Sequence, residues 1–338
     1  MEAPDVSTLA PDDVLIGVRR AAVGWVDLIM TSGQYQHMAK PPYTPGLEFA
    51  GVVLWRGPAA GDAPALGAEV LIDPFLAGPR SLGAHQRWGG FASYAVAPAR
   101  AVLAVPGALS LDEACNLLDN YETAYHCLIA RAKLQAGETV LIHGATGATG
   151  LAAVQVAKTV GAKVIATGRT AAKLEIVTQH GADHVLVTSA EGFDLRAEVK
   201  ALTEGRGVDV VYDGVGGDIS AESLRCVRFG ARFLVVGWAA TPFVAKGKGE
   251  RGAPNANQLP TNLIMMKGVD VLGCPTAIST GVDPSIRPPR LEQVLAWAAS
   301  GDITPYVSHR FAFADWREAM LAKWKGEIIG GGVLQIAD

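Results

Sequence analysis

The chain has 338 residues, of which 49% are hydrophobic and 18% charged, and its formal net charge at pH 7 is −4. This composition excludes a disordered chain, and the length favours two folded domains. The small negative charge argues against binding to nucleic acid or to an anionic membrane. No apolar run approaches the roughly 20 residues of a membrane span, and the first residues lack a secretory signal, so a cytoplasmic protein is expected.

The first 119 residues carry the pattern of an all-β or barrel-like domain. Their apolar runs are short, and proline or glycine separates one run from the next. Such punctuation favours strands joined by tight turns over alternating strands and helices. The expected strands cover residues 14–18, 49–54, 69–73 and 91–96.

Residues 138–158 combine a strand, a glycine-rich turn and a helix. Residues 139–143 form a β-branched, apolar run suited to a buried parallel strand, and a helical apolar pattern follows from Leu151. The turn between them consists of Gly144, Ala145, Thr146, Gly147, Ala148, Thr149 and Gly150. Glycines let a turn approach a pyrophosphate closely, and helix N-terminal amides face its charge. The stretch predicts a dinucleotide site; the alternative is a tight turn that binds no ligand.

The next strand, expected at residues 163–167, indicates which dinucleotide binds. An NAD site places an acidic residue near the end of this strand, where it holds the ribose 2′-hydroxyl. Here the strand runs into Arg169, with Lys173 soon after, and no acid competes. A guanidinium pairs bidentately with a 2′-phosphate, so the sequence favours NADP(H). The alternative is that both are solvated surface charges.

The alternation of strands and helices continues through the middle of the chain. It predicts a parallel sheet with helices on both faces. A helix is expected over residues 172–180, with strands at 181–187, 208–217, 231–238 and 269–274. Ligands on such sheets bind beyond the carboxyl ends of the strands. The residues therefore expected to line the cofactor cleft are Gly214, Val215, Gly237 and Trp238.

In the last 60 residues the pattern of apolar residues changes again. Helices are expected over residues 291–299 and 314–323, and strands over 307–313 and 332–336. These elements are suited to complete the N-terminal domain. The four cysteines, at positions 115, 127, 226 and 274, lack the spacing of a zinc site and are expected to be buried thiols.

Taken together, the motifs give the chain a family resemblance. The matching segments are residues 45–53, 89–94, 121–125, 144–150, 209–217 and 259–268. The chain resembles the zinc-independent quinone oxidoreductase branch of the medium-chain dehydrogenase/reductase superfamily. The resemblance implies an α/β fold with two domains: a GroES-like β-barrel catalytic domain (1–119 and 279–338) and a Rossmann NADP-binding domain with a doubly wound parallel sheet (120–278). It also implies a homodimer paired through the last Rossmann strand.

The sequence departs from the zinc-dependent members of this superfamily at their metal ligands. Those enzymes carry Gly-His-Glu where this chain has Gly46, Leu47 and Glu48, and no cysteine occurs before position 115. Without these ligands no catalytic metal is expected. Glu48 is expected to be a structural, hydrogen-bonding acid.

Three residues near the N-terminus are the candidate catalytic side chains. Tyr35 matches the position of a tyrosine in related enoyl reductases, and a phenol is able to donate a proton at neutral pH; the alternative is a packing residue. Trp25 replaces the asparagine common in the family, which suits a flat ring or a changed pocket. Asp27 matches the family's aspartate, with a structural role as the alternative.

Further cofactor contacts follow from matching positions. Thr123 and Asn262 are expected near the nicotinamide, and Tyr125 on the helix behind it. A glycine-rich stretch, residues 246–252, carries Lys246, Lys248 and Arg251 and is typical of a surface loop. Its charges either bind a phosphorylated or CoA-borne substrate or are solvated. The histidines at 126, 143 and 184 are expected to be ordinary hydrogen-bonded side chains.

These residues predict an NADPH-dependent, metal-free reductase of quinones or other conjugated carbonyl compounds. An enoyl-thioester or 2-alkenal reductase with Tyr35 as proton donor is the alternative enzyme. A non-catalytic NADPH-binding protein, regulatory or crystallin-like, is the alternative of another class, because fold alone does not decide chemistry.

Overall fold

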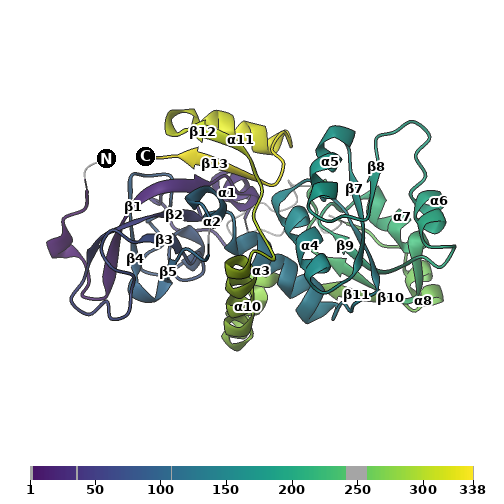
Figure 1. The fold of residues 1–338 in the computed structure, drawn as a ribbon, viewed down its shortest axis with the longest axis horizontal. Helices are drawn as coiled ribbons and strands as arrows, with labels where there is room; N and C mark the ends of the chain where they lie inside the picture. The colour runs from purple at the N-terminus through teal and green to yellow at the C-terminus, as the bar shows by residue number, and fades with distance from the viewer. Residues whose placement is uncertain (1–2, 36, 108, 241–256, 338) are drawn as a thin grey trace. The chain divides into compact units, whose positions relative to one another are not determined.

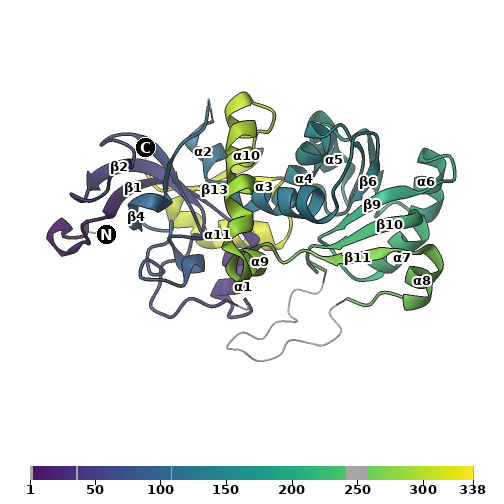
Figure 2. The same cartoon turned by 90° about the horizontal axis from the view of Figure 1, so that it is seen from below.

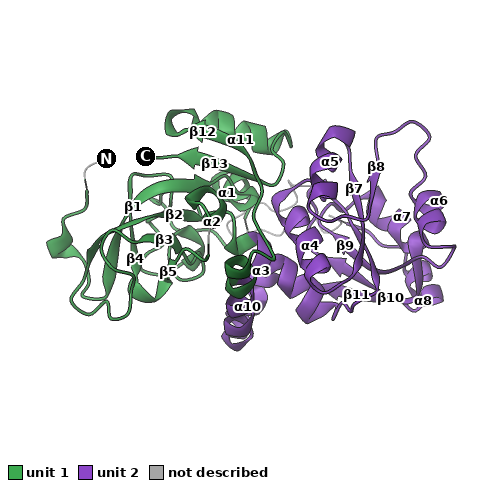
Figure 3. Cartoon of the chain, in the orientation of Figure 1, with its two compact units in different colours: residues 1–119, 245–251, 295–338 green, residues 120–244, 252–294 purple. Residues whose placement is uncertain are grey.

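The computed structural model describes residues 3–35, 37–107, 109–240 and 257–337 (Figure 1). Within them the chain forms two compact units, each with a sheet of its own (Figure 3). The first comprises residues 3–119 and 295–337, and the second comprises most of 120–294. The domain limits implied by the resemblance, which assign residues 279–294 to the catalytic domain, stay a prediction.

A seven-stranded sheet forms the frame of the first unit. Its order is β12 (Val307–Ala312), β13 (Gly331–Gln335), β1 (Asp13–Ala22), β2 (Phe49–Arg56), β3 (Glu69–Ile72) and β5 (Val102–Ala104), with β4 (Tyr94–Pro98) also paired to β1. The strands expected from the short apolar runs are confirmed, and β5 was missed. Antiparallel pairing of β13 with β1 confirms that the tail completes this sheet.

The core of the first unit lies along β1. Val14, Ile16 and Val18 alternate along the strand and are buried in one apolar cluster with residues of β2 and β3. Alternate residues of a strand face the same side, so this spacing buries one face of β1. β1 and β2 approach so closely that a Cβ at Gly51 would lie 2.1 Å from the carbonyl oxygen of Gly17. Only glycine fits there.

Three α-helices of the first unit accompany the sheet. They are α1 (Trp25–Thr31), α2 (Leu111–Ala114) and α11 (Trp316–Trp324). The start of α1 and the end of α11 meet through their tryptophans, because the rings of Trp25 and Trp324 stack with centroids 5.7 Å apart and planes 5° from parallel. This contact joins two segments from opposite ends of the chain.

The second unit contains a six-stranded parallel sheet. Its order is β11 (Asp270–Gly273), β10 (Val227–Val235), β9 (Val208–Asp213), β6 (Thr139–Ile142), β7 (Lys163–Gly168) and β8 (His184–Val187). Neighbouring strands in it pair in parallel throughout. The order reverses direction between β6 and β9, which is the switch point where doubly wound sheets bind ligands. The predicted Rossmann-type sheet is confirmed.

Helices cover both faces of this sheet, with α4 and α5 on one face and α7 and α8 on the other (Figure 2). The helices are α3 (Leu118–Tyr125), continuing as the π-helix His126–Arg131, then α4 (Ala148–Thr159), α5 (Ala171–Gln179), α6 (Leu195–Leu202), α7 (Asp218–Cys226), α8 (Thr261–Lys267), α9 (Thr276–Val282) and α10 (Arg287–Ser300), which passes into the first unit. Among the described residues, no helix combines the length and hydropathy needed to cross a membrane.

The starts of two strands of this sheet differ from the sequence expectation for a clear local reason. β10 begins at Val227 rather than at 231, because the strand passes an irregularity in its register around Gly230, whose φ is +70°. β8 begins at His184 rather than at 181, because Gly181 (φ +107°) ends the preceding helix. All four cysteines are buried free thiols, as expected.

Candidate functional site

The turn between β6 and α4 is shaped by its glycines. Gly144 has φ +65°, in the left-handed region that favours glycine. A Cβ at Gly150 would lie 2.3 Å from the carbonyl oxygen of Gly144, so only glycine lets α4 pack against the turn. A Cβ at Gly147 would make an ordinary contact, 3.4 Å from the carbonyl oxygen of Gly144, so a side chain fits there. The three glycines therefore differ in role: Gly144 allows the turn's backbone conformation, Gly150 allows helix packing, and Gly147 is not required by either.

In the described part of the chain, no side chain caps the N-terminus of α4. The helix begins at Ala148, and its N-cap residue is Gly147. The Thr149 hydroxyl donates to the Asn120 side chain at 3.0 Å, and Ala145 N–H donates to the Thr167 carbonyl at 3.1 Å, which holds both ends of the turn. Uncapped amides and the helix dipole favour a phosphate at such a place. The turn fits a dinucleotide's pyrophosphate.

Arg169 lies directly after β7, beside this turn. It follows Gly168, where a Cβ would be 3.2 Å from the methyl group of Thr146 and 3.0 Å from Leu174. This close packing holds the end of β7 against the glycine turn. Arg169 is exposed, and Lys173 lies half-buried in the first turn of α5. Their assignment to a 2′-phosphate stays a prediction.

The turns after β9 and β10 join the same edge of the sheet. The Asp213 carboxylate accepts the Val215 and Gly216 amides at 2.9 and 3.0 Å, and its carbonyl accepts the Gly237 amide at 3.2 Å. The Val215 side chain would lie 3.1 Å from a Cβ at Gly144. The structure thus brings the predicted turn residues together. Gly214 accepts the Ala239 amide at 3.2 Å, and Trp238 is 40% exposed.

For two other predicted cofactor residues, the structure gives exposure and position in a helix but no contact with these turns. Thr123 is half-buried on α3, and Asn262 is exposed as the second residue of α8. Their assignment to the nicotinamide end stays a prediction. Lys246, Lys248 and Arg251 lie outside the described residues.

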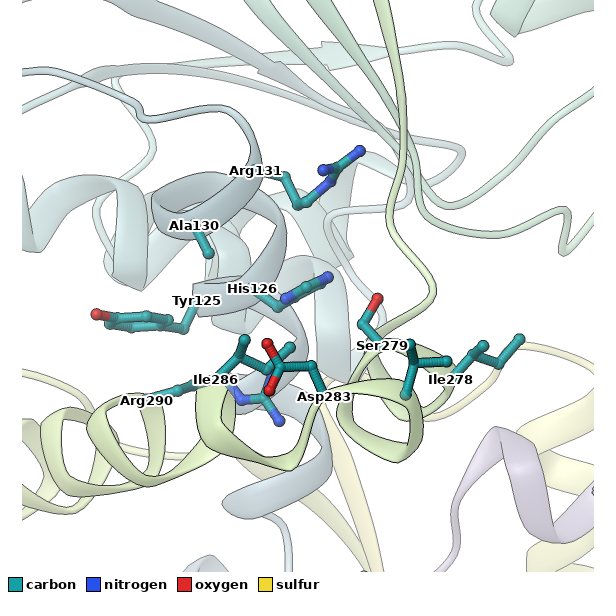
Figure 4. A pocket seen from close by; sticks show the side chains of 10 residues that line it. Tyr125, His126, Ala130, Arg131, Ile278, Ser279, Asp283, Ile286 and Arg290 are labelled. Carbon is teal, nitrogen blue, oxygen red and sulfur yellow. The ribbon is translucent and has the colours of Figure 1, made fainter.

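A cavity of about 450 Å³ opens in the second unit (Figure 4). It is lined by Tyr125, His126, Ala130, Arg131, Ile278, Ser279, Val282, Asp283, Ile286 and Arg290. Next to it, the fully buried Glu122 binds the guanidinium groups of Arg287 and Arg290 at 2.8–3.0 Å. Burial, with Arg290 and Arg131 nearby, lowers the pKa of His126 to about 4, so this ring is neutral. The sequence pattern gave no signal for this cluster.

His143 is an ordinary buried histidine, as the sequence analysis expects. Its Nδ1 bonds with the Thr167 hydroxyl at 2.9 Å and its Nε2 with the Ser223 hydroxyl at 2.6 Å. Burial lowers its pKa to about 4. It ties β6 to β7 and α7 as a neutral ring.

In the first unit, Tyr35 lies in a small apolar cluster. It is 5% exposed and is grouped with Met30, Ala39 and Leu47. Its ring meets that of His37 edge-on, with centroids 5.9 Å apart. A tyrosine in apolar surroundings combines a packing surface with one polar hydroxyl. The position fits both of the roles considered from the sequence.

The Asp27 carboxylate accepts hydrogen bonds from the backbone. The donors are the amides of Gly24, Gly46 and Leu47 at 3.0–3.1 Å, and the residue is 2% exposed. Burial raises its pKa to about 7 against the opposing effect of these hydrogen bonds. The bonds fix the start of α1 and the turn that precedes β2. In our interpretation Asp27 positions this loop, and a direct part in catalysis stays a prediction.

A largely buried charge cluster, in which Glu48 is buried, was missed by sequence reasoning. Arg80 pairs with Asp119, whose backbone amide donates to the Glu48 carboxylate at 2.8 Å. Burial and the charge of Asp119 raise the pKa of Glu48 well above its ordinary value. Burial lowers the pKa of Lys323 to about 8, with Asp27 and Glu48 acting in the opposite direction. Of the residues in this cluster, the sequence indicated only Glu48, as a structural acid.

Among the described residues, no group of three or more histidine, cysteine, aspartate or glutamate side chains could hold a metal ion. The expectation of metal-free chemistry rests on Leu47 and on the absence of an early cysteine, and it stays a prediction.

Known proteins match the chain over nearly its whole length. The family models described as "Alcohol dehydrogenase GroES-like domain" and "Zinc-binding dehydrogenase" match residues 10–107 and 148–299. A quinone oxidoreductase-like protein 2 homolog of Nematostella vectensis is 31% identical over 313 residues, which are 92% of this chain and 78% of that protein. The human quinone oxidoreductase is 32% identical over 239 residues, 70% and 68% of the two chains. The chain belongs to the quinone oxidoreductase branch of the medium-chain dehydrogenase/reductase superfamily.

Solved structures agree with this membership. A probable oxidoreductase from Mycobacterium abscessus has a TM-score of 0.80 at 29% identity, covering 99% of this chain and 93% of that one. The quinone oxidoreductase from Thermus thermophilus, solved also in complex with NADPH, has a TM-score of 0.75 at 25% identity, covering 99% and 94%. The present protein is an oxidoreductase with the fold of this superfamily.

Proposed function

We propose that this oxidoreductase transfers a hydride from NADPH to a quinone or another conjugated carbonyl compound, without a metal ion. The observation that carries the proposal is the uncapped, glycine-lined turn before α4 with Arg169 beside it. The NADPH complex of the Thermus thermophilus relative and the quinone oxidoreductases among the relatives support it.

In this proposal the second unit holds the cofactor. The backbone of Gly144–Gly150 receives the pyrophosphate, and Arg169 and Lys173 receive the 2′-phosphate. Gly214, Val215, Gly237 and Trp238 border the same edge of the sheet, and Thr123 and Asn262 face the nicotinamide. When bound, NADPH supplies the hydride.

The first unit handles the acceptor. We assign residues 1–119 and 279–338 to the catalytic domain. The Tyr35 hydroxyl holds a proton and gives it to the acceptor as negative charge develops there, and solvent restores the proton afterwards. The apolar side chains of Met30 and Leu47 keep water away from this hydroxyl. The flat indole of Trp25 suits a ring-shaped acceptor.

The test follows NADPH oxidation by absorbance with 1,4-benzoquinone, 9,10-phenanthrenequinone, a 2-alkenal and crotonyl-CoA, with NADH in parallel. Quinone turnover with a preference for NADPH is the expected result. Arg169→Ser should weaken NADPH binding by about tenfold to a hundredfold and leave NADH unchanged, since a charged pair contributes about 1.5–3 kcal/mol. Arg196→Ser, at another exposed arginine of the unit, is the control.

Other outcomes would redirect the function. Turnover of the alkenal or the thioester alone would favour alkene reduction, for which the buried position of Tyr35 is the supporting observation. NADPH binding without any turnover would favour a non-catalytic binding protein. We also propose that the protein acts in the cytoplasm as a homodimer.

A further inference from the structure

Arg80 is a largely buried cation whose hydrogen bonds are incomplete. Its side chain is 11% exposed, and one Nη pairs with the Asp119 carboxylate. The guanidinium also lies over the Phe75 ring, 5.4 Å from its centroid. Its Nε is buried and finds no hydrogen-bond partner in the part of the chain that the structure describes. A buried donor without a partner is costly, so its retention calls for an explanation such as a bound ligand or a catalytic task.

Acidic and phenolic groups surround this guanidinium. Burial alone would lower the pKa of Arg80, but Asp119, Tyr35, Glu48 and Asp27 together raise it, so the side chain stays charged. The same groups include Tyr35, the proton donor of the proposed reaction. Geometry links the two side chains through one segment: Tyr35 packs with Leu47, and Glu48, the next residue, accepts the amide of Asp119, the partner of Arg80.

The proposed chemistry creates a need for such a charge. When a hydride adds to a quinone or an enone, two electrons enter the conjugated system and the carbonyl oxygen becomes negative. A guanidinium held in a low-dielectric site stabilises an oxyanion strongly, because it does not have to reorganise during the reaction. Arg80 is preorganised in this sense by its pairing with Asp119 and its packing over Phe75.

We propose that Arg80 is the electrophilic residue of the acceptor site, binding the acceptor's carbonyl oxygen and stabilising the negative charge that hydride addition leaves on it. Tyr35 then delivers its proton to the reduced acceptor, solvent returns a proton to the tyrosine, and NADP⁺ leaves. This inference rests on the proposed function. Its competitor is a purely structural role, in which Arg80 only neutralises Asp119 and Glu48.

The first experiment compares Arg80→Met with Arg87→Met. Arg87 is an arginine of the same loop that lies 4.6 Å from the centroid of the Trp88 ring, and so is a matched control. We expect Arg80→Met to lower kcat/KM for the quinone by about 10²–10³-fold, as for other oxyanion donors. NADPH affinity should be unchanged, and Arg87→Met should stay within about twofold of the wild type. Unchanged turnover in Arg80→Met would overturn the proposal.

Loss of activity through misfolding needs a separate control, because removing one partner of a buried ion pair is destabilising. The double variant Arg80→Met/Asp119→Asn removes both charges. If its thermal stability recovers while its activity stays low, catalysis requires Arg80 itself. If its activity recovers, the role is structural. In Arg80→Ala, recovery of at least tenfold with ethylguanidinium, but not with ethylammonium, is also expected.

A turnover-free measurement separates this inference from the proposed function. 4-Nitrophenol resembles the reduced, oxyanionic acceptor, and its absorbance reports whether it is ionised. Bound to the NADP⁺-loaded protein, it should ionise at lower pH than in water, and Arg80→Met should abolish that shift. If Arg80 lowers the pH at which bound 4-nitrophenol ionises but no quinone is turned over, the proposed acceptor is wrong and the oxyanion site is supported. Quinone turnover with no Arg80-dependent shift would overturn the oxyanion site alone.

Discussion

Asp27 contributes two oxygens to three amides that belong to different segments. One oxygen binds Gly24 at the start of α1, and the other binds Gly46 and Leu47 before β2. The carboxylate is buried, so its charged form is disfavoured even though the amides support it. This balance makes the local structure sensitive to pH in the neutral range.

Asp27→Asn tests that sensitivity. Because the pKa of Asp27 rises from 3.8 to about 7 on folding, the folded state holds the proton more tightly than the unfolded chain. The resulting stabilisation is complete below about pH 4 and disappears as the pH rises to about 7. The free energy of unfolding of the wild type should therefore fall relative to Asp27→Asn over this window, by at most about 1.4 kcal/mol per pH unit.

Urea denaturation at pH 4.5, 6 and 8 measures the difference. Asp62→Asn, at an exposed aspartate, is the control and should follow the wild type at each pH. A constant gap between wild type and Asp27→Asn would show that Asp27 titrates as it does in the unfolded chain.

The sequence indicated candidate site residues where a local motif or the carboxyl end of a predicted strand marks them. The glycine turn and Arg169 occupy adjacent stretches, and their spacing carries the signal. Arg80 and Asp119 are 39 positions apart, and Glu48 is 71 positions from Asp119. Since no periodic pattern connects them, only the folded chain brings the cluster together. The same holds for Glu122 and its two arginines.

Among the elements, α4 and the turn before it contain one glycine that the fold requires and another that only cofactor binding is expected to require. Gly150 is required by packing, because a Cβ there would overlap the Gly144 carbonyl, whereas Gly147 has φ −78° and a Cβ there would make only an ordinary contact at 3.4 Å. The fold tolerates alanine at 147. A bound pyrophosphate does not, if it occupies the place of the added Cβ.

Gly147→Ala should thus keep the wild-type melting temperature within about 2 °C and weaken NADPH binding at least tenfold. Gly150→Ala should lower the melting temperature by several degrees, since the helix must shift away from the turn. Thermal unfolding without cofactor and fluorescence titration with NADPH measure the two effects. Equal NADPH affinity in Gly147→Ala and wild type would place the pyrophosphate elsewhere.

Among the helices, the longer ones were predicted better than the shortest ones. The buried strands of both sheets show as apolar runs, and α4, α5, α10 and α11 show helical spacing. α1 and α8 have seven residues each, too few for a periodic pattern to emerge. α1 is instead held by the Asp27 bonds and the Trp25–Trp324 stack, which are tertiary contacts.

For the whole molecule, β11 is the edge of the six-stranded sheet. Edge strands offer unpaired backbone groups to another chain, and Val271 on β11 is 39% exposed. If the proposed homodimer pairs through this strand, Val271→Asp should shift sedimentation from dimer towards monomer. Leu66→Asp, at an exposed leucine of the first unit, should not. Monomeric wild-type protein at micromolar concentration would contradict the homodimer.

The pairing of β1 with β13 also dictates an order of events during synthesis. A long stretch of chain separates the end of β5 at Ala104 from the start of β13 at Gly331. While the ribosome makes it, the whole parallel sheet emerges, since its strands all lie between residues 139 and 273. The second unit can therefore fold first, whereas the sheet of the first unit is completed only when β13 has been made.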